Sequence, residues 1–317
     1  LISTIFEAKS GILWVGTFGG GTSRFNLDRE WFTHIRSNPE NPNGLPHSFV
    51  RSLATGKNKR LYLGTDHGIA IWNTEDLSFE LVPKNGPETE SVINTILEDK
   101  NGILWLGTKG DGLIRRGTSG ESVVFRRNPE VPNSLGHDNV SKIYEDSLGR
   151  IFIGTQGGGL YQFLSESNQF QKIIPSDGKK NDFITDLIED LNGDLWISGE
   201  GKIFLLQKGK LQSEPIEKIF PSASRTSGSL ATVIFPDSNG IVWIGTQDAG
   251  LDRFNTTTGE ISNYNSSINA LPDDNVVSLI KDDSNFLWVT TQSGIARLNS
   301  MQTEFRVFSP DDGLQKD

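Results

Sequence analysis

The segment EDKNGILWLGTKGDGLIRR occupies residues 98–116, and it is one of seven related copies in the 317-residue chain. Its apolar centre, ILWLGT at 103–108, returns as ILWVGT, RLYLGT, RIFIGT, DLWISG, IVWIGT and FLWVTT. The aromatic residues of the seven copies are spaced 43 to 48 residues apart, and they are Trp14, Tyr62, Trp105, Phe152, Trp196, Trp243 and Trp288. A fixed period of about 46 residues indicates a repeat architecture.

Each repeat contains four short segments with the composition of β-strands. An Asp six residues before the aromatic residue and a Gly three residues before it, such as Asp99 and Gly102, predict a tight turn between the first two segments. The second segment is apolar at nearly every position, which suits a sheet that is covered on both faces. We therefore predict an all-β fold, a seven-bladed β-propeller with four antiparallel strands per blade.

The whole chain is expected to form this single domain, with one blade per repeat. The predicted blades are 1-46, 47-90, 91-136, 137-181, 182-229, 230-273 and 274-317. Because the first and last repeats are complete, no strand is left to exchange between the chain ends. We expect the first and last blades to meet through apolar side chains around Trp14 and Trp288, without hydrogen bonds between them. This seam should be the weakest junction of the ring.

Composition excludes several classes of function. The formal net charge of −10 leaves no basic excess for phosphates, which argues against a nucleic-acid partner. The absence of cysteine excludes disulfides, thiolate nucleophiles and cysteine-ligated metals. No window approaches the roughly 18 consecutive apolar residues of a membrane span, and the first residues lack the pattern of a signal peptide. We expect a soluble chain that does not insert directly into a membrane.

Three repeats and the connectors between repeats resemble the two-component regulator propeller repeat. The repeats are the segment at 98–116, EDSLGRIFIGTQGGGLYQF at 145–163 and PDSNGIVWIGTQDAGLDRF at 236–254. The connectors are NPNGLPHSFV at 41–50, VPNSLGHDNV at 131–140 and NALPDDNV at 269–276. The resemblance covers essentially the whole chain. Its departures are Ala8, Gly56 and Lys59 in the turns, and 198–199 and 290–291 in place of Gly-Thr.

This resemblance implies a place in a bacterial signalling receptor. Propellers of the family form the extracytoplasmic sensor region, followed by an immunoglobulin-like connector, a transmembrane helix and an output domain. The output is commonly a histidine kinase, often a hybrid one, or a diguanylate cyclase. The resemblance thus implies a periplasmic location, with neighbouring domains of the same receptor as partners and a homodimer as an open alternative. The final PDDGLQKD at 310–317 resembles the lead-in to a further part of such a receptor, so we expect a fragment.

Candidate ligand-binding residues are those that differ between repeats, because shared packing does not explain them. The loops between second and third strands lie on the same face as the connectors that enter the first strands. The candidates on this face are Phe18, His47, Asp66, His67, Lys109, Asp111, His137, Gln156, Glu200, Gln247, Asp248 and Gln292, with Asp274 nearby. The column expected to face the channel is Ser3, Arg51, Asn94, Ser141, Thr185, Thr232 and Val277, of which Arg51 and Asn94 are also ligand candidates. Such a polar lining suits a hydroxylated or zwitterionic solute.

Features that repeat in every blade favour structural roles. The aromatic column is expected to fill the space between blades rather than to form a sugar-stacking platform. Trp31 and Trp72 are assigned to the core for the same reason. The glycine-rich loops at 18–21 and 156–159 join two strands and do not open a helix, so we expect no nucleotide-binding role for them.

We find no catalytic constellation in the sequence. The four histidines, His34, His47, His67 and His137, lack the spacing of metal ligands, and turns account for the repeated Asp residues. We expect no enzyme activity, no metal and no cofactor, and a sensor domain that binds a small polar molecule or an oligosaccharide. Two alternatives stay open: a propeller lyase or lactonase with an axial metal or His site, and a protein-interaction scaffold.

Overall fold

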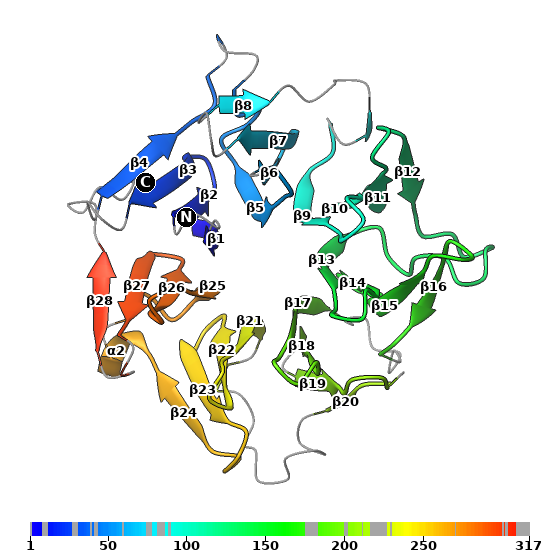
Figure 1. Cartoon of the computed structure of the whole chain (residues 1–317). Helices are drawn as coiled ribbons and strands as arrows, with labels where there is room; N and C mark the ends of the chain where they lie inside the picture. Colours follow the sequence, from blue (N-terminus) through cyan, green and yellow to red (C-terminus); the bar gives the residue numbers. More distant parts are fainter. Residues whose placement is uncertain are drawn as a thin grey trace.

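The computed structural model is a ring of seven four-stranded antiparallel sheets, which confirms the predicted propeller (Figure 1). In each sheet the four strands follow one another in sequence order, so every blade is a simple meander. The first strand of each blade lies nearest the axis of the ring and the fourth lies at its outer edge (Figure 1). The structure describes residues 2–7, 12–26, 31–38, 40, 44–58, 60–73, 78–80, 86–87, 90–174, 183–199, 202–210, 212–215, 227–228, 230–269, 271–299, 301 and 304–308.

The strands of the seven blades have the following bounds. The innermost strands are β1 (Ile2–Glu7), β5 (Val50–Thr55), β9 (Ile93–Glu98), β13 (Val140–Glu145), β17 (Ile184–Glu189), β21 (Ala231–Pro236) and β25 (Val276–Lys281). The second strands are β2 (Leu13–Thr17), β6 (Arg60–Thr65), β10 (Leu104–Thr108), β14 (Ile151–Thr155), β18 (Leu195–Gly199), β22 (Ile241–Thr246) and β26 (Leu287–Thr291). The third strands are β3 (Gly21–Asn26), β7 (Gly68–Asn73), β11 (Leu113–Arg116), β15 (Gly159–Leu164), β19 (Lys202–Leu206), β23 (Leu251–Asn255) and β27 (Gly294–Leu298). The outer strands are β4 (Trp31–Ile35), β8 (Ser78–Glu80), β12 (Ser122–Phe125), β16 (Gln169–Lys172), β20 (Glu214–Pro215), β24 (Ile261–Tyr264) and β28 (Phe305–Phe308), and a short helix, α2 (Ser266–Asn269), follows β24.

The aromatic column of the second strands is buried between blades. Trp196 and Trp243 expose 2% and 1% of their surfaces, which confirms the packing interpretation. Each column residue packs toward the blade that follows it in sequence, as Trp105 does against Phe163 at 4.9 Å between ring centroids. The neighbouring blades thus cover both faces of every second strand, which is why the second strands are continuously apolar.

The Asp of each turn also binds the indole of the column residue. The Oδ1 atom of Asp99 accepts the N–H groups of Asn101 and Ile103 at 2.8 and 3.0 Å, as the turn chemistry predicts. Its Oδ2 atom accepts the Nε1–H of Trp105 at 2.9 Å. The same bond joins two further pairs, Asp190 to Trp196 at 3.0 Å and Asp282 to Trp288 at 2.7 Å. The repeated Asp therefore closes the turn and satisfies a buried donor at once.

The first repeat shows what the loss of this Asp does. Ala8 stands six residues before Trp14 in the sequence, and it lies outside the described residues. Among the described residues, the buried Nε1–H of Trp14 has no hydrogen-bond acceptor. The indole is held there by packing alone, including an edge-to-face contact with Trp72 at 5.6 Å.

Hydrogen bonds join neighbouring blades, so contact between blades is not limited to apolar side chains. Along the inner strands, a polar side chain donates to the first carbonyl of the next blade. Examples are Ser141 to Ile184 at 2.5 Å and Thr232 to Val276 at 2.5 Å. Both side chains belong to the column expected to face the channel, and their hydroxyls are bonded to main chain. Val277 occupies the equivalent position in the last blade, and its side chain has no hydrogen-bond donor.

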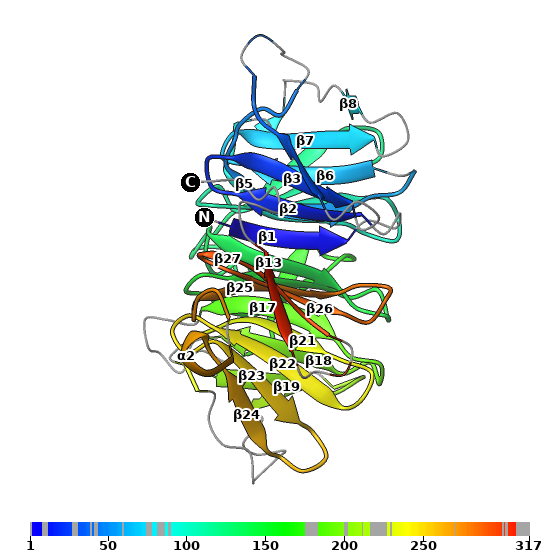
Figure 2. The same cartoon turned by 90° about the vertical axis from the view of Figure 1, so that its left-hand side faces the viewer.

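The seam between the first and last blades differs from the prediction in one respect, its hydrogen bonding. Figure 2 shows β1 beside the strands of the last blade, and each of these two sheets contains only strands from its own end of the chain. As predicted, apolar residues around Trp14 and Trp288 join the two blades: Leu13 and Val15 share one buried cluster with Trp288, and Phe25 contacts Trp288 at 5.4 Å between ring centroids. Trp14 itself faces the second blade, because column residues pack forward along the chain. The expectation of no hydrogen bond is wrong, since the N–H of Asp283 donates to Glu7 at 3.5 Å.

Candidate functional site

The two faces of the ring carry different connections. The loops between second and third strands and the connectors between blades form one face, which we call the loop face. The Asp turns and the loops between third and fourth strands form the opposite face, which we call the turn face. Antiparallel four-stranded meanders enforce this division, because odd and even connections lie at opposite ends of the strands. All described candidate residues lie on the loop face or on the inner strands.

A histidine–aromatic cluster occupies the loop face of the first two blades. It comprises Phe18, His47, Phe49, Arg51, Asp66 and His67. The imidazoles of His47 and His67 stack at 5.5 Å with an interplanar angle of 20°, and His47 also stacks on Phe49 at 5.2 Å. Phe18 lies 6.3 Å from Phe49, and the two rings are 36% and 37% exposed. Exposed aromatic rings of this kind are typical of binding surfaces.

Charged groups hold one side of the histidine–aromatic cluster. Arg51 forms an ion pair with Asp66 and places its guanidinium 5.4 Å from the ring centroid of Phe18. The main-chain carbonyl of Asp66 lies 3.0 Å from Nδ1 of His67. The Nδ1 atom of His47 accepts the N–H of Phe49 at 3.1 Å. The cluster therefore combines apolar, aromatic and ionic groups in one patch.

An amide network crosses the loop face between the third and fourth blades. Asn94 donates to the side chain of Asn139 at 3.0 Å, and Asn139 donates to Gln156 at 2.5 Å. His137 stands next to this network, and its Nδ1 atom accepts the N–H of Asn139 at 3.0 Å. The structure thus joins three predicted residues, Asn94, His137 and Gln156, through Asn139. Sequence reasoning missed Asn139, although it lies in the quoted connector VPNSLGHDNV.

Most of the other candidates are spread around the ring, but the main chain of Lys109 forms an isolated β-bridge with Asn139 of the amide network. Asp111 pairs with Arg126 at 3.1 Å near the surface, and the N–H of Lys109 donates to the carbonyl of Val92 at 2.9 Å. Gln292 accepts from Asn275 at 3.2 Å on the last blade. The exposed pair Gln247 and Asp248 lies on the sixth blade. Glu200 lies outside the described residues.

Asp274 has a structural partner of its own, because its carboxylate accepts the N–H of Ser266 at 2.7 Å. The position that matches His47 and His137 is Asp273, which accepts the N–H of Asn275 at 2.7 Å. The part of the chain that the structure describes brings no three His, Cys, Asp or Glu side chains together in a way that could hold a metal ion. Within the described ranges, no helical segment has the length and apolar composition needed to cross a bilayer.

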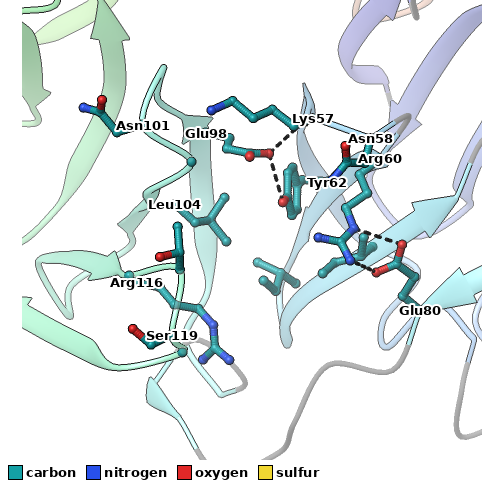
Figure 3. Close-up of a pocket in the computed structure, with 16 residues that line it drawn as sticks. Lys57, Asn58, Arg60, Tyr62, Glu80, Glu98, Asn101, Leu104, Arg116 and Ser119 are labelled. Atoms are coloured by element: carbon teal, nitrogen blue, oxygen red, sulfur yellow. Dashed lines mark hydrogen bonds and ion pairs between the residues drawn. The ribbon is translucent and has the colours of Figure 1, made fainter.

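A cavity that sequence reasoning missed opens between the second and third blades on the turn face. Its volume is about 510 Å³. The second blade contributes Lys57, Arg60 and Tyr62, and the third contributes Glu98, Leu104 and Arg116, among other lining residues (Figure 3). None of the predicted candidate residues lines it.

Ionic groups of the cavity wall are paired with one another. Arg60 binds Glu80 through two contacts of 3.0 and 2.8 Å, and this bond raises the pKa of Arg60. Glu98 accepts the hydroxyl of Tyr62 at 3.1 Å and the N–H of Lys57 at 2.9 Å. Burial, reinforced by the negative charge of Glu98, raises the pKa of Tyr62 to about 12. Tyr62 is therefore a neutral hydrogen-bond donor at physiological pH.

Comparison with known sequences supports the resemblance seen in the repeats. Residues 87–110 and 134–157 match the family described as two component regulator propeller. A curated relative, histidine kinase P4 of Formosa agariphila, is 25% identical over 147 residues. That match covers 44% of this chain and 11% of the relative, so the chain spans only a small part of that protein.

Solved structures share the propeller fold. The extracellular domain of a hybrid two-component system from B. thetaiotaomicron superposes with a TM-score of 0.60 at 23% identity, covering 97% of this chain and 43% of that one. A second such domain from the same organism gives 0.60 at 20% identity, with coverages of 97% and 46%. Virginiamycin B lyase from Staphylococcus aureus gives 0.69 at 16% identity, with coverages of 93% and 94%.

These comparisons and the ring define the class of protein. The chain is a seven-bladed β-propeller with four antiparallel strands per blade. Two of its segments, residues 87–110 and 134–157, match the two component regulator propeller family, and they overlap two of the quoted repeats. The similarity to solved structures establishes the fold and leaves the activity to be argued from the surface.

Proposed function

We propose that this propeller is a non-enzymatic sensor domain on the extracytoplasmic side of a two-component receptor. The observation that carries the proposal is the likeness of the ring, over 97% of its length, to extracellular domains of hybrid two-component systems. The matched repeats and the histidine kinase relative point the same way. That relative favours a kinase over a diguanylate cyclase as the output, with neighbouring receptor domains and a homodimer as candidate partners.

The ligand in this proposal is a small polar molecule or an oligosaccharide on the loop face. The histidine–aromatic cluster supports this choice, because exposed rings such as Phe18 can stack on a sugar while Arg51 and Asp66 offer ionic hydrogen bonds. The amide network of Asn94, Asn139 and Gln156 adds donors and acceptors on the same face. Binding would shift the equilibrium between two arrangements of the receptor domains. The size of that shift is set by the difference in the ligand's affinity for the two arrangements.

A thermal-shift screen of the purified chain against oligosaccharides and small polar solutes tests the proposal. We expect at least one solute to raise the melting temperature, and Phe18→Ala and His47→Ala to weaken its binding at least tenfold. Val124→Thr is the matched control, because Val124 is exposed on the outer strand β12 of the third blade and does not belong to the histidine–aromatic cluster. An unchanged affinity in both loop-face variants would contradict the site.

A propeller lyase is the second candidate function, because virginiamycin B lyase has the same fold. The two functions differ in the fate of the solute, which a sensor releases unchanged and a lyase converts. A protein-interaction scaffold is the third candidate, and the absence of any stabilising solute would favour it.

A further inference from the structure

The fourth strand of each blade is the outer edge of its sheet. In the third blade this strand is β12, and it lies on the outside of the ring (Figure 1). An edge strand carries main-chain N–H and C=O groups that can pair with a strand of another chain. Natural proteins commonly protect such edges with lysine, with proline or by making the strand very short. The outer strands are therefore the places to look for a partner surface.

Strand β12 lacks these protections. Its sequence is Ser-Val-Val-Phe, and two neighbouring side chains, Val123 and Val124, are 39% and 38% exposed. By contrast, the exposed side chains of β16 are two glutamines and a lysine, and β20 is only two residues long and ends in Pro215. Exposed valines on an unprotected edge are typical of a surface that pairs with another strand.

The hydrogen-bond pattern of the blade shows which main-chain groups of β12 face outward. In the hairpin between β11 and β12, the N–H of Gly117 donates to the carbonyl of Glu121 at 2.9 Å. Hydrogen-bonded and non-hydrogen-bonded pairs alternate along an antiparallel ladder. Val123, two positions further along, therefore exchanges hydrogen bonds with β11, whereas Val124 does not. The N–H and C=O groups of Val124 point away from β11.

The charges that flank β12 make its edge self-complementary. Glu121 directly precedes the strand, Arg127 lies two residues beyond its end, and both are exposed. When two copies of β12 pair antiparallel about a two-fold axis through Val124, this residue lies opposite its own copy and Glu121 lies opposite Arg127 of the second copy. Opposite charges that face each other across two strands stabilise the pairing. The outward main-chain groups and the charges thus favour the same register.

From this match we propose that β12 is a homodimer interface, in which the third blades of two copies join into one continuous sheet. The occupant of the edge is a second copy of the chain, because the register that pairs Glu121 with Arg127 needs the same strand on both sides. A two-fold interface of this kind is closed, so association stops at the dimer. The homodimer of the sensor proposal thereby acquires an interface, although the pairing itself requires no ligand.

Sedimentation velocity of the purified chain from micromolar to millimolar concentration tests this interface. We expect a monomer that converts to a dimer as the concentration rises, because a short strand buries a small area. Val124→Lys places two ammonium groups opposite each other at the axis and should abolish the dimer. Val307→Lys is the matched control, because Val307 is 43% exposed on the outer strand β28 of the last blade, and this variant should dimerise like the wild type.

Charge reversal tests the register itself. Glu121→Arg and Arg127→Glu each bring like charges together at two symmetry-related places, so either variant should weaken association about tenfold. The double variant, Glu121→Arg with Arg127→Glu, restores opposite charges and should recover the association of the wild type. Because these positions are exposed, each variant should keep the far-ultraviolet circular dichroism of the wild type.

The outcomes separate this interface from the loop-face sensor. A dimer that Val124→Lys abolishes and that the double reversal recovers would support the proposal. It is overturned if the chain stays monomeric at every concentration, if Val124→Lys still dimerises, or if species larger than a dimer form. Failure of the double reversal to recover association would also overturn it, because the register would then be wrong. None of these measurements contains a solute, so failure of the interface is distinct from failure of the sensor.

Discussion

The two tryptophans Trp14 and Trp105 allow the bond between the turn Asp and the indole to be measured with matched variants. Both side chains are buried, at 1% and 2% exposure, but only Trp105 donates its Nε1–H to a carboxylate, that of Asp99 at 2.9 Å. Replacing either residue by Phe removes the same ring atoms. The losses in apolar burial should therefore be similar and cancel in the comparison.

The hydrogen bond remains as the difference between the two variants. Trp105→Phe loses a bond to a buried charged group, worth about 1.5–3 kcal/mol. Trp14→Phe removes a buried donor without a described acceptor, which relieves a penalty of about 1–3 kcal/mol. The free energy of unfolding should consequently fall by at least about 2 kcal/mol more in Trp105→Phe than in Trp14→Phe.

Urea unfolding followed by far-ultraviolet circular dichroism measures this difference, because that signal does not depend on the tryptophan removed. The wild type provides the reference for both variants. Equal losses in the two variants, or a larger loss in Trp14→Phe, would refute the argument that Asp99 stabilises the fold through the indole.

Three further predictions concern packing, the seam and pH. Trp196→Ala and Trp243→Ala should each lower the free energy of unfolding by roughly 3–5 kcal/mol in the same assay, because each truncates a buried aromatic residue. Hydrogen exchange should show blades one and seven opening before blades three to five. The variant Val277→Thr should slow that opening, because the new hydroxyl can add a hydrogen bond worth about 1 kcal/mol across the seam. Uniform protection around the ring would contradict the weak seam. Because the pKa of Tyr62 is raised from 10.0 to about 12, the neutral phenol stabilises the folded chain fully below pH 10, and this contribution is lost as the pH rises through 12. Burial also raises the pKa of Tyr144, so a spectrophotometric titration should show two tyrosines ionising late in the wild type and one fewer in Tyr62→Phe.

The sequence predicts the fold well because its period is expressed in residues with strong local preferences. The Asp and Gly of the turn, the apolar second strand and the Gly-Thr pair each have a structural cause that repeats. Thr108, for example, donates to the carbonyl of Gly112 at 2.7 Å and accepts the N–H of Asp111 at 2.8 Å. A Cβ atom at Gly107 would lie only 2.6 Å from Val140 of the next blade, so glycine is needed there.

Contacts between blades were harder to predict, because they depend on the direction in which each side chain points. The hydrogen bond from Asp283 to Glu7 across the seam was not predicted for this reason. Ser141 and Thr232 were placed correctly on the inner strands, but their bonds to the next blade depend on the stagger between sheets. A linear sequence does not contain that stagger.

The candidate site was predicted in part. Reasoning from loops selected Phe18, His47 and His67 separately, and the ring brings them together because the first two blades are neighbours. The cavity was missed, although its signal is in the sequence. An arginine at position 116 stands where four other blades have an aromatic residue, and only an alignment of third strands reveals it.

The most direct test of the sensor proposal is to follow the best-stabilising solute by NMR in the presence of the purified chain. The proposal predicts that the lines of the solute broaden, that His47→Ala abolishes the broadening, and that the solute is recovered unchanged after a day. Accumulation of a product would contradict the proposal in favour of an enzyme, and undiminished broadening in His47→Ala would contradict the loop-face site.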